Sequence, residues 1–429
     1  MAVSEEVPHG VQANPVVMDA MVRASEKHVI VASEDILDAR GFKLWAKGQP
    51  ISAGLQQKLL ERQLQQPLEA CLAAQDGVTM SQLRGQLEEF FASESSLAQG
   101  LQPWASELLQ HMPTLQLHTV AQLLLTTALV TRMSFVSHAV TASALMGAMA
   151  LAKGDAVAKV REAMLAGLLH DIGEMYIQPE YLDSTDPLDL LGHKHLAVHP
   201  RMAQMLLTTT TDYGPALCRA IGEHHERLDG SGYPARLRGA QMSELGKMLS
   251  VVEVTLGIAR SQSTPMRRTS FALRVIPGEF DLGPVSFVCN MASRMQEEIS
   301  QANLSSPAVD ILNPRQRIQE KLHDLAQLHA DLALKGGTPP AMAIVDGATA
   351  RLGRLQIAWN SLGFWGANAS DLSGEVHFEL DMADRELNQR LRELQRECLL
   401  LAMRLPLSER GQLAPLWREL QVEADAPSA

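Results

Sequence analysis

Cysteine and aromatic residues are scarce in this chain of 429 residues, and acidic residues outnumber basic ones. The four cysteines lie far apart and form no C-x-x-C pair, which excludes a disulfide framework and a zinc ribbon. Lysine and arginine number 37 against 49 acidic residues, so the formal net charge is −12. That balance disfavours a general surface for nucleic-acid phosphates, and we expect no long nucleic acid among the partners.

Long apolar runs are also missing. The chain begins MAVSEEVPHG, which is acidic and lacks the apolar segment of a signal peptide. No stretch approaches the roughly eighteen consecutive apolar residues that a bilayer span requires. We therefore expect a cytoplasmic protein with no membrane partner, and the chain is long enough for roughly two or three domains.

Residues 1–75 predict a small α+β module. Residues 28–32 and 43–46 are short apolar stretches that flank an Asp-containing turn, so we expect them to pair as strands. Ser52 is a favourable N-cap, and leucines recur at helical spacing as far as Leu64. The pattern predicts a helix that ends there.

The middle of the chain has the composition of a helical bundle. Between residues 81 and 298, most apolar side chains recur with a period of about 3.6, which is the period of an α-helix. Alanine, leucine and methionine dominate, and aromatic residues make up only 4% of the chain. The predicted helices span residues 120–133, 137–151, 156–169, 202–210 and 284–300.

The last third of the chain contains Pro307, Pro314 and a Gly-Pro break at 336–340, which indicate at least one linker or sharp turn. Residues 381–405 predict a long amphipathic helix whose alternating Arg and Glu favour a solvated face or a helix-pairing surface. The fold class we expect is mainly α. Its parts are an α+β module over 1–75, a helical connector over 76–114, a helical-bundle domain over 115–298 and a helical extension over 299–429.

A spaced set of imidazoles and carboxylates in the central domain could hold two metal ions. His138 lies 32 residues before His170, and His199 lies 29 residues after it. Each falls on a predicted helix or at a helix end. Imidazoles and carboxylates without cysteine suit iron or manganese better than structural zinc. The full set is His138, His170, Asp171, His199, His224, His225 and Glu253.

The segment from His224 to Pro234 has the sequence HHERLDGSGYP. Together with the pair His170-Asp171, it resembles the signature of the HD-GYP phosphodiesterases over about residues 115 to 298. The resemblance implies an HD-type helical bundle with a dinuclear metal centre, in which His170 and Asp171 are catalytic. It also implies that Asp171 bridges the two ions, with His138, His170 and Glu253 on one ion and His199, His224 and His225 on the other.

His195 is a rival ligand, because it precedes His199 by four residues and would share its face of a helix. The resemblance favours His199, which is followed by Pro200 as in the family pattern. The family also has aspartate where this chain has Glu253, and a longer side chain keeps the charge while it shifts the geometry. Ser134 stands where trinuclear members have glutamate, so we expect no third metal.

The substrate-binding positions depart further from the family. Glu174 stands where the family usually has a lysine that engages a substrate phosphate, and a carboxylate would repel that phosphate or attract another cation. The Arg-Pro-Tyr-Arg element of the family is represented only by residues 264–267, which keep the proline and Arg267. The resemblance assigns the remaining substrate contacts to the loop residues Gly232, Tyr233 and Pro234.

These observations lead to one leading hypothesis and two alternatives. The first is a metal-dependent phosphodiesterase, carrying two iron or manganese ions, that hydrolyses cyclic di-GMP to a linear dinucleotide or to GMP. The second is a degenerate regulatory protein that binds a cyclic dinucleotide or a signalling partner without efficient turnover. The third is an HD-type hydrolase of a different nucleotide. A signalling-protein partner and a homodimer are further expectations.

Overall fold

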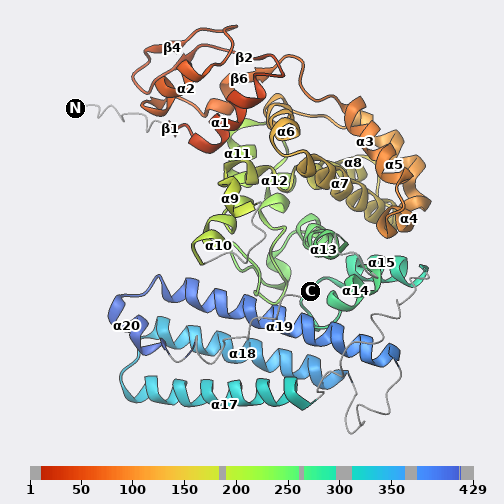
Figure 1. Ribbon diagram of the computed structural model, residues 1–429, viewed down its shortest axis with the longest axis vertical. Coiled ribbons are helices and arrows are strands. Elements are labelled where there is room, and N and C mark those ends of the chain that lie inside the picture. The colour runs from red at the N-terminus through yellow and green to blue at the C-terminus, as the bar shows by residue number, and fades with distance from the viewer. Residues whose placement is uncertain are drawn as a thin grey trace. The chain divides into compact units, whose positions relative to one another are not determined.

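The computed structural model describes residues 11–182, 190–259, 265–295, 312–362, 374–414 and 416. The described chain is mainly helical, which confirms the predicted fold class (Figure 1). It divides into two compact units. The first comprises Met1–Leu188, His195–Glu226 and Gly232–Leu256, and the second comprises Asp189–Lys194, Arg227–Ser231 and Gly257–Ala429. The four-part division expected from the sequence stays a prediction.

The N-terminal part of the first unit combines two helices with short antiparallel strand pairs. Its helices are α1 (Pro15–Ala24) and α2 (Ala53–Leu60). In the described residues, β1 (Val11–Gln12) pairs with β5 (Gln63–Leu64), β2 (Ile30–Ala32) with β6 (Leu72–Ala74), and β3 (Ile36–Leu37) with β4 (Lys43–Trp45). This part is therefore α+β, as predicted.

The predicted pairing of 28–32 with 43–46 is wrong, although each stretch contains a strand. The reason is a local turn, in which the Asp38 carboxylate accepts backbone N–H groups from Arg40 and Phe42. This turn folds β4 back onto the residues that precede it, so β4 pairs with β3. Strand β2 then pairs with β6.

Ser52 caps α2 as predicted, and its Oγ accepts the N–H of Leu55 at 3.3 Å. The helix ends four residues earlier than the leucine spacing predicts, because Gln63 and Leu64 pair with the first strand instead. Leu64 is nonetheless buried, as its place in the helical pattern indicates.

The rest of the first unit is helical and carries four of the predicted helices; the fifth, predicted over 284–300, corresponds to α15 (Leu282–Ser293) of the second unit, and residues 296–300 lie outside the described part of the chain. The longer ones are α3 (Met80–Ala92), α6 (Thr119–Thr131), α7 (Met133–Lys153), α8 (Val157–Leu169), α11 (His199–Thr210), α12 (Pro215–Gly222) and α13 (Glu244–Ala259). The shorter ones are η1 (Leu68–Cys71), α4 (Ser96–Leu101), η2 (Gln102–Trp104), α5 (Ala105–His111), η3 (Met112–Thr114), η4 (Ile172–Tyr176), α9 (Pro179–Leu182) and η5 (Gly239–Gln241). Most of α10 (Leu190–Leu196) is assigned to the second unit.

Helices α7 and α8 pack closely because small residues line their contact. A Cβ atom at Gly167 would lie 2.6 Å from the carbonyl oxygen of Ala142 and 2.8 Å from the backbone nitrogen of Ser143. Both neighbours are backbone atoms, which cannot move aside as a side chain can. The glycine therefore sets the separation of two helices that both carry residues of the site described below.

Helix α7 is long and apolar enough, by composition, to cross a membrane. Polar residues such as Ser137 and His138 interrupt it, however, and its most apolar window is 72% buried inside the protein. We interpret α7 as a core helix. Among the described residues, no other helix meets the same test.

The second unit is built from α14 (Pro265–Ala272), α15 (Leu282–Ser293), α17 (Leu312–Leu334), α18 (Pro339–Ser361), α19 (Gly374–Ala402) and α20 (Leu407–Gln412). Helices α17, α18 and α19 lie side by side (Figure 1). The predicted break at 336–340 is the turn between α17 and α18, where Gly336 takes a φ of +71° and Thr338 caps the next helix.

The long charged helix predicted over 381–405 corresponds to α19, which starts earlier, at Gly374, and ends at Ala402, before the predicted end. One face of α19 is buried in the core of the unit. Its buried residues recur at helical spacing and are Leu380, Ala383, Leu387, Leu391, Leu394 and Cys398. This apolar face is the one through which α19 packs within the unit.

We predict that Gly167→Ala lowers the free energy of unfolding by about 1 to 3 kcal/mol, because the added methyl group overpacks the contact between α7 and α8. Urea unfolding of the full chain measures the change. Gly85→Ala is the matched control, since Gly85 lies within α3 and a Cβ there meets nothing within 4 Å. The control should be neutral or stabilising by up to about 1 kcal/mol. Equal stabilities for the two variants would contradict the packing argument.

Candidate metal centre

All seven of the predicted metal ligands lie together in the first unit, and we call this set the metal centre. His138 comes from α7 and Glu253 from α13. The others stand at helix ends, where the backbone changes direction and adjacent side chains can face one point. His170 and Asp171 end α8, His199 begins α11, and His224 and His225 follow the end of α12.

Asp171 lies between two pairs of imidazoles, and each of its oxygens faces one pair. Its Oδ2 lies 3.1 Å from Nε2 of both His138 and His170. Its Oδ1 lies 3.4 Å from Nε2 of His199 and 3.3 Å from Nε2 of His224. A carboxylate placed in this way can bridge two cations.

Backbone carbonyls fix the orientation of three buried rings. In each case Nδ1 lies close to the carbonyl oxygen of the residue three positions earlier in the chain. The distances are 2.8 Å for His170 and Gly167, 2.7 Å for His199 and Leu196, and 2.6 Å for His224 and Ile221. Since a carbonyl only accepts, each Nδ1 must carry a hydrogen, and in a neutral ring Nε2 then carries a lone pair. The Nε2 atoms of all three rings face Asp171.

The convergence of these nitrogens indicates a cation site. Nε2 of His199 and of His224 are 2.9 Å apart, and Nε2 of His138 and of His170 are 3.3 Å apart. Two lone pairs at such distances repel each other unless a proton or a metal ion lies between them. In addition, the buried Oε2 of Glu253 has no hydrogen-bond partner. The residues therefore fit metal ions.

The ligand atoms form two groups that share Asp171. One group is His138, His170, Asp171 and Glu253, and the other is Asp171, His199, His224 and His225. Within each group, one ligand atom from every residue lies within 4.8 Å of all the others. This is the division that the family resemblance implies, and the centre can hold two ions.

The carboxylates of the centre are held in their ionised form. Burial would raise the pKa of Asp171, but His170 and His138 overcome that effect and keep it well below its usual value. Burial would likewise raise the pKa of Glu253, and its contacts with His170 and His225 lower it instead. An ionised carboxylate is the form that binds a metal.

The imidazoles differ from one another. Burial lowers the pKa of His225, and the charge of His224 lowers it further; burial is also the main reason that the pKa of His224 is lowered. Burial would lower the pKa of His170 too, but Asp171 and Glu253 raise it. Neutral His224 and His225 are ready to act as ligands, whereas His170 would exchange a proton for the metal.

The short helix η4, which follows Asp171, is held in place on two sides. A Cβ atom at Gly173 would overlap the carbonyl oxygen of His199, so only glycine allows this segment to approach α11 so closely. Tyr176 donates a hydrogen bond of 2.7 Å to the buried carboxylate of Glu69. No sequence pattern predicts this long-range pair, which holds the segment that follows Asp171.

The loop residues assigned to the substrate lie next to His225. The ring of Tyr233 stacks on the ring of His225, with 4.5 Å between centroids and 17° between planes. Glu226, fully buried, accepts the backbone N–H groups of the three residues that follow Pro234, which are Ala235, Arg236 and Leu237. Sequence analysis missed Glu226, although its place directly after two ligands was a signal. The substrate role of Gly232, Tyr233 and Pro234 stays a prediction.

Glu174 has a cationic partner that sequence analysis missed. Nη1 of Arg132, just before α7, lies 3.1 Å from Oε2 of Glu174, and both side chains are less than one fifth exposed. Burial raises the pKa of Glu174, and the charge of Asp171 adds to this effect. Arg132 therefore neutralises the carboxylate at the position where the resemblance places a cation. Any contact of Glu174 with substrate stays a prediction.

Two other predicted candidates lie elsewhere. The rival ligand His195 is outside both metal groups, and its ring stacks on Tyr181 at 5.2 Å. Arg267 belongs to the second unit, where it lies on α14 with its guanidinium over the ring of Phe378. Its contact with substrate stays a prediction.

Comparisons with known proteins agree with this centre. A family model described as an HD domain matches residues 124–270, a segment that contains all seven residues of the centre. The 3'3'-cGAMP-specific phosphodiesterase 1 of Vibrio cholerae is 29% identical over 149 residues, which are 34% of this chain and 30% of that protein. A cyclic di-GMP phosphodiesterase of Pseudomonas aeruginosa is 36% identical over 117 residues, 27% of this chain and 28% of that protein.

The chain thus spans less than a third of the length of these two curated relatives. Among solved structures, an HDG"Y"P protein from Bdellovibrio bacteriovorus aligns with a TM-score of 0.35 and 20% sequence identity. That alignment covers 50% of this chain and 70% of the other.

We predict that Asp171→Asn loses at least about tenfold in metal affinity, because the substitution removes the charge shared by both groups. The measurement is elemental analysis of protein loaded with Mn²⁺ and then dialysed. Wild-type protein should keep two ions per chain, and the variant fewer than one. His195→Ala is the control and should keep two. Retention of both ions by Asp171→Asn would show that Asp171 is not the shared ligand.

A second prediction concerns the Arg132–Glu174 pair. Glu174→Lys should lower the free energy of unfolding by about 1 to 3 kcal/mol, since it places two cations side by side in a largely buried site. The double variant Arg132→Ser, Glu174→Lys should recover part of the loss. Thermal unfolding followed by circular dichroism compares the two. No recovery in the double variant would mean that repulsion from Arg132 is not the cause.

Proposed function

We propose that the chain carries an HD domain of the HD-GYP type and is a metal-dependent phosphodiesterase of cyclic di-GMP. The product would be a linear dinucleotide or GMP. One observation carries the proposal: both oxygens of Asp171 are used, each toward a separate pair of imidazole nitrogens. That arrangement suits two ions held side by side, as in-line displacement at a phosphate requires.

The donor set suggests which metals the centre would take. It consists of five imidazoles and two carboxylates, with no cysteine. We propose iron or manganese, because both accept mixed nitrogen and oxygen ligands. When bound, such ions would lower the pKa of a water molecule and neutralise the charge that develops on the phosphoryl group.

The residues around the centre would prepare it for this chemistry. The carbonyls of Gly167, Leu196 and Ile221 lock three rings before any metal binds, so the ligands need little reorganisation. Near-complete burial of His170 and His224 excludes bulk water from that side of the centre. Tyr233 covers the outer ligand His225 with a flat ring, a surface on which a nucleobase could stack.

The substrate class rests on the relatives. Two of them are named for cyclic di-GMP and for 3'3'-cGAMP, which are both cyclic dinucleotides. We propose cyclic di-GMP as the substrate and the cytoplasm as the location, with a signalling protein and a second copy of the chain as further partners. An HD-type hydrolase of another nucleotide remains the third hypothesis.

A regulatory role without turnover is the second candidate. The Arg132–Glu174 pair favours it, because Glu174 offers a substrate phosphate no cation of its own and occupies the neighbouring arginine. A protein of this kind would keep its metals and bind a cyclic dinucleotide, but release it unchanged.

We predict that protein loaded with Fe²⁺ or Mn²⁺ under anaerobic conditions converts cyclic di-GMP to a linear product, resolved by chromatography. Asp171→Asn should reduce the rate by at least about a hundredfold, because the two metal ions lose the ligand that they share. His195→Ala should retain the wild-type rate. Parallel reactions contain 3'3'-cGAMP or bis(p-nitrophenyl) phosphate, which reports phosphodiester cleavage without a nucleotide.

Each outcome selects one hypothesis. Binding of cyclic di-GMP measured by calorimetry, with no product under either metal, would favour the regulatory role. Cleavage of bis(p-nitrophenyl) phosphate alone would keep the reaction class and reject the substrate. Failure to cleave any of the three compounds would contradict the enzyme proposal.

A further inference from the structure

A buried cluster of four charges fixes the first residue of the loop that follows His225. Nη1 of Arg227 lies 2.8 Å from the Glu279 carboxylate and 2.7 Å from the Glu393 carboxylate. Arg390 contacts the same two carboxylates, with Nε 3.1 Å from Glu279. The side chains of Glu279 and Arg390 are 1% and 5% exposed, so these contacts form out of water. We call these four residues the charge cluster.

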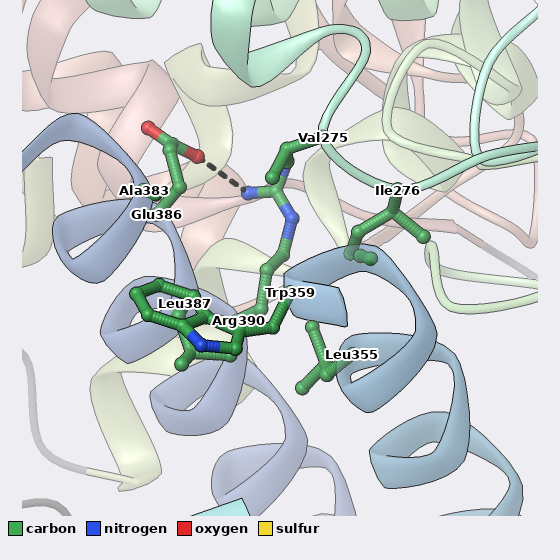
Figure 2. Close-up of a pocket in the computed structure, with 9 residues that line it drawn as sticks. Val275, Ile276, Leu355, Trp359, Ala383, Glu386, Leu387 and Arg390 are labelled. Atoms are coloured by element: carbon green, nitrogen blue, oxygen red, sulfur yellow. Dashed lines mark ion pairs between the residues drawn. The ribbon is translucent and has the colours of Figure 1, made fainter. Parts of the chain in front are cut away.

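The surroundings of the charge cluster make its ion pairs strong. Figure 2 shows the stem of Arg390 rising from α19 among Ile276, Leu355 and Trp359, with its guanidinium paired to Glu386. Apolar neighbours of this kind lower the local dielectric, which strengthens the attraction between paired charges and increases the cost of an unpaired one.

The charge balance of the cluster depends on Arg227. With it, two arginines face Glu279 and Glu393, and Glu386 lies on the edge. Without it, Arg390 alone would face three carboxylates in a site that excludes water, which is unfavourable. Burial would raise the pKa of Glu393, but Arg227 and Arg390 lower it instead.

The loop that begins at Arg227 makes further bonds inside the second unit. The N–H of Leu228 donates to the carbonyl oxygen of Glu279 at 2.9 Å. The Asp229 carboxylate pairs with Arg354 of α18 at 3.0 Å. Gly230 takes a φ of +78° and closes a turn by donating to the carbonyl of Arg227 at 2.9 Å. Side chain and backbone thus both hold residues 227–230.

The residues directly before Arg227 belong to the metal centre and its support. His225 lies two residues before it, and Glu226, directly before it, binds the backbone amides that follow Pro234. Two consecutive residues therefore hold the loop. Glu226 binds the amides at its far end within the first unit, and Arg227 holds its first residue within the second unit. A shift of Arg227 would be passed to His224 and His225 along only a few covalent bonds.

We infer that Arg227 is a positioning residue, through which the C-terminal helices fix the loop of residues 227–234 and so set the affinity of the centre for metal. Its catalytic consequence rests on the proposed function, but the positioning itself does not. Helix α19 supplies the carboxylate of Glu393 to Arg227, and Arg390 of the same helix pairs with the two carboxylates that Arg227 contacts.

The test compares Arg227→Gln and Glu393→Gln with the wild-type chain. Hydrogen exchange followed by mass spectrometry reports the amides of Leu228 and Gly230, and calorimetry measures the affinity for Mn²⁺ with no nucleotide present. We expect both variants to exchange these amides at least about tenfold faster. We also expect a loss of about tenfold or more in Mn²⁺ affinity.

Glu397→Gln is the matched control. Glu397 lies four residues after Glu393 on α19, is buried to a similar degree, and pairs with Arg351 instead of the loop. It should lower thermal stability about as much as Glu393→Gln, yet leave loop exchange and Mn²⁺ affinity within about twofold of wild type. Arg227→Lys keeps the charge, and its amide exchange and Mn²⁺ affinity should lie between those of wild type and Arg227→Gln. It replaces Arg227→Gln in the test if that variant does not fold.

Wild-type exchange and Mn²⁺ affinity in Glu393→Gln would overturn the inference, and so would an equal effect of Glu397→Gln. A wild-type chain that takes up no Mn²⁺ would contradict the proposed function instead, and amide exchange would still decide whether Arg227 holds the loop. Altered loop exchange with unchanged Mn²⁺ affinity would also overturn the inference, because the loop would then not position the ligands.

Discussion

The placement of a single carboxylate, Asp171, governs the rest of the metal centre. Both of its oxygens face imidazole nitrogens, at 3.1 to 3.4 Å, and each oxygen serves a different pair. Such a cluster of donors is unfavourable in a protein interior unless cations compensate for it. The surrounding fold can be understood as the framework that holds the donors together before the ions arrive.

That framework depends on close backbone approaches and on helix ends. Gly167 lets α7 and α8 meet, and Gly173 lets the residues after Asp171 reach α11. Carbonyls at the ends of helices orient three rings through Nδ1, so their Nε2 atoms point inward. Each device acts through the backbone, which is more rigid than side-chain packing.

The sequence could predict the centre but not its supports. The five helices predicted for the central domain, the Ser52 cap and the seven converging ligands follow from periodicity, capping and spacing, because these are local patterns or match a known motif. Arg132, Glu69 and the partners of Arg227 were missed, since each contacts a residue far away in the chain and has no motif of its own. The N-terminal strands were found but mispaired, because strand pairing depends on the turn that Asp38 closes. The roles of Gly232 and Arg267 toward substrate stay predictions.

The most direct measurement is anomalous X-ray scattering from crystals of the Mn²⁺-loaded protein, collected at the manganese edge. The account predicts two peaks, one on each side of the Asp171 carboxylate, with ligand distances of about 2.0 to 2.3 Å. One peak should lie beside His138, His170 and Glu253, and the other beside His199, His224 and His225. A single peak, or peaks that Asp171 does not touch, would contradict the central claim that one carboxylate joins two ions.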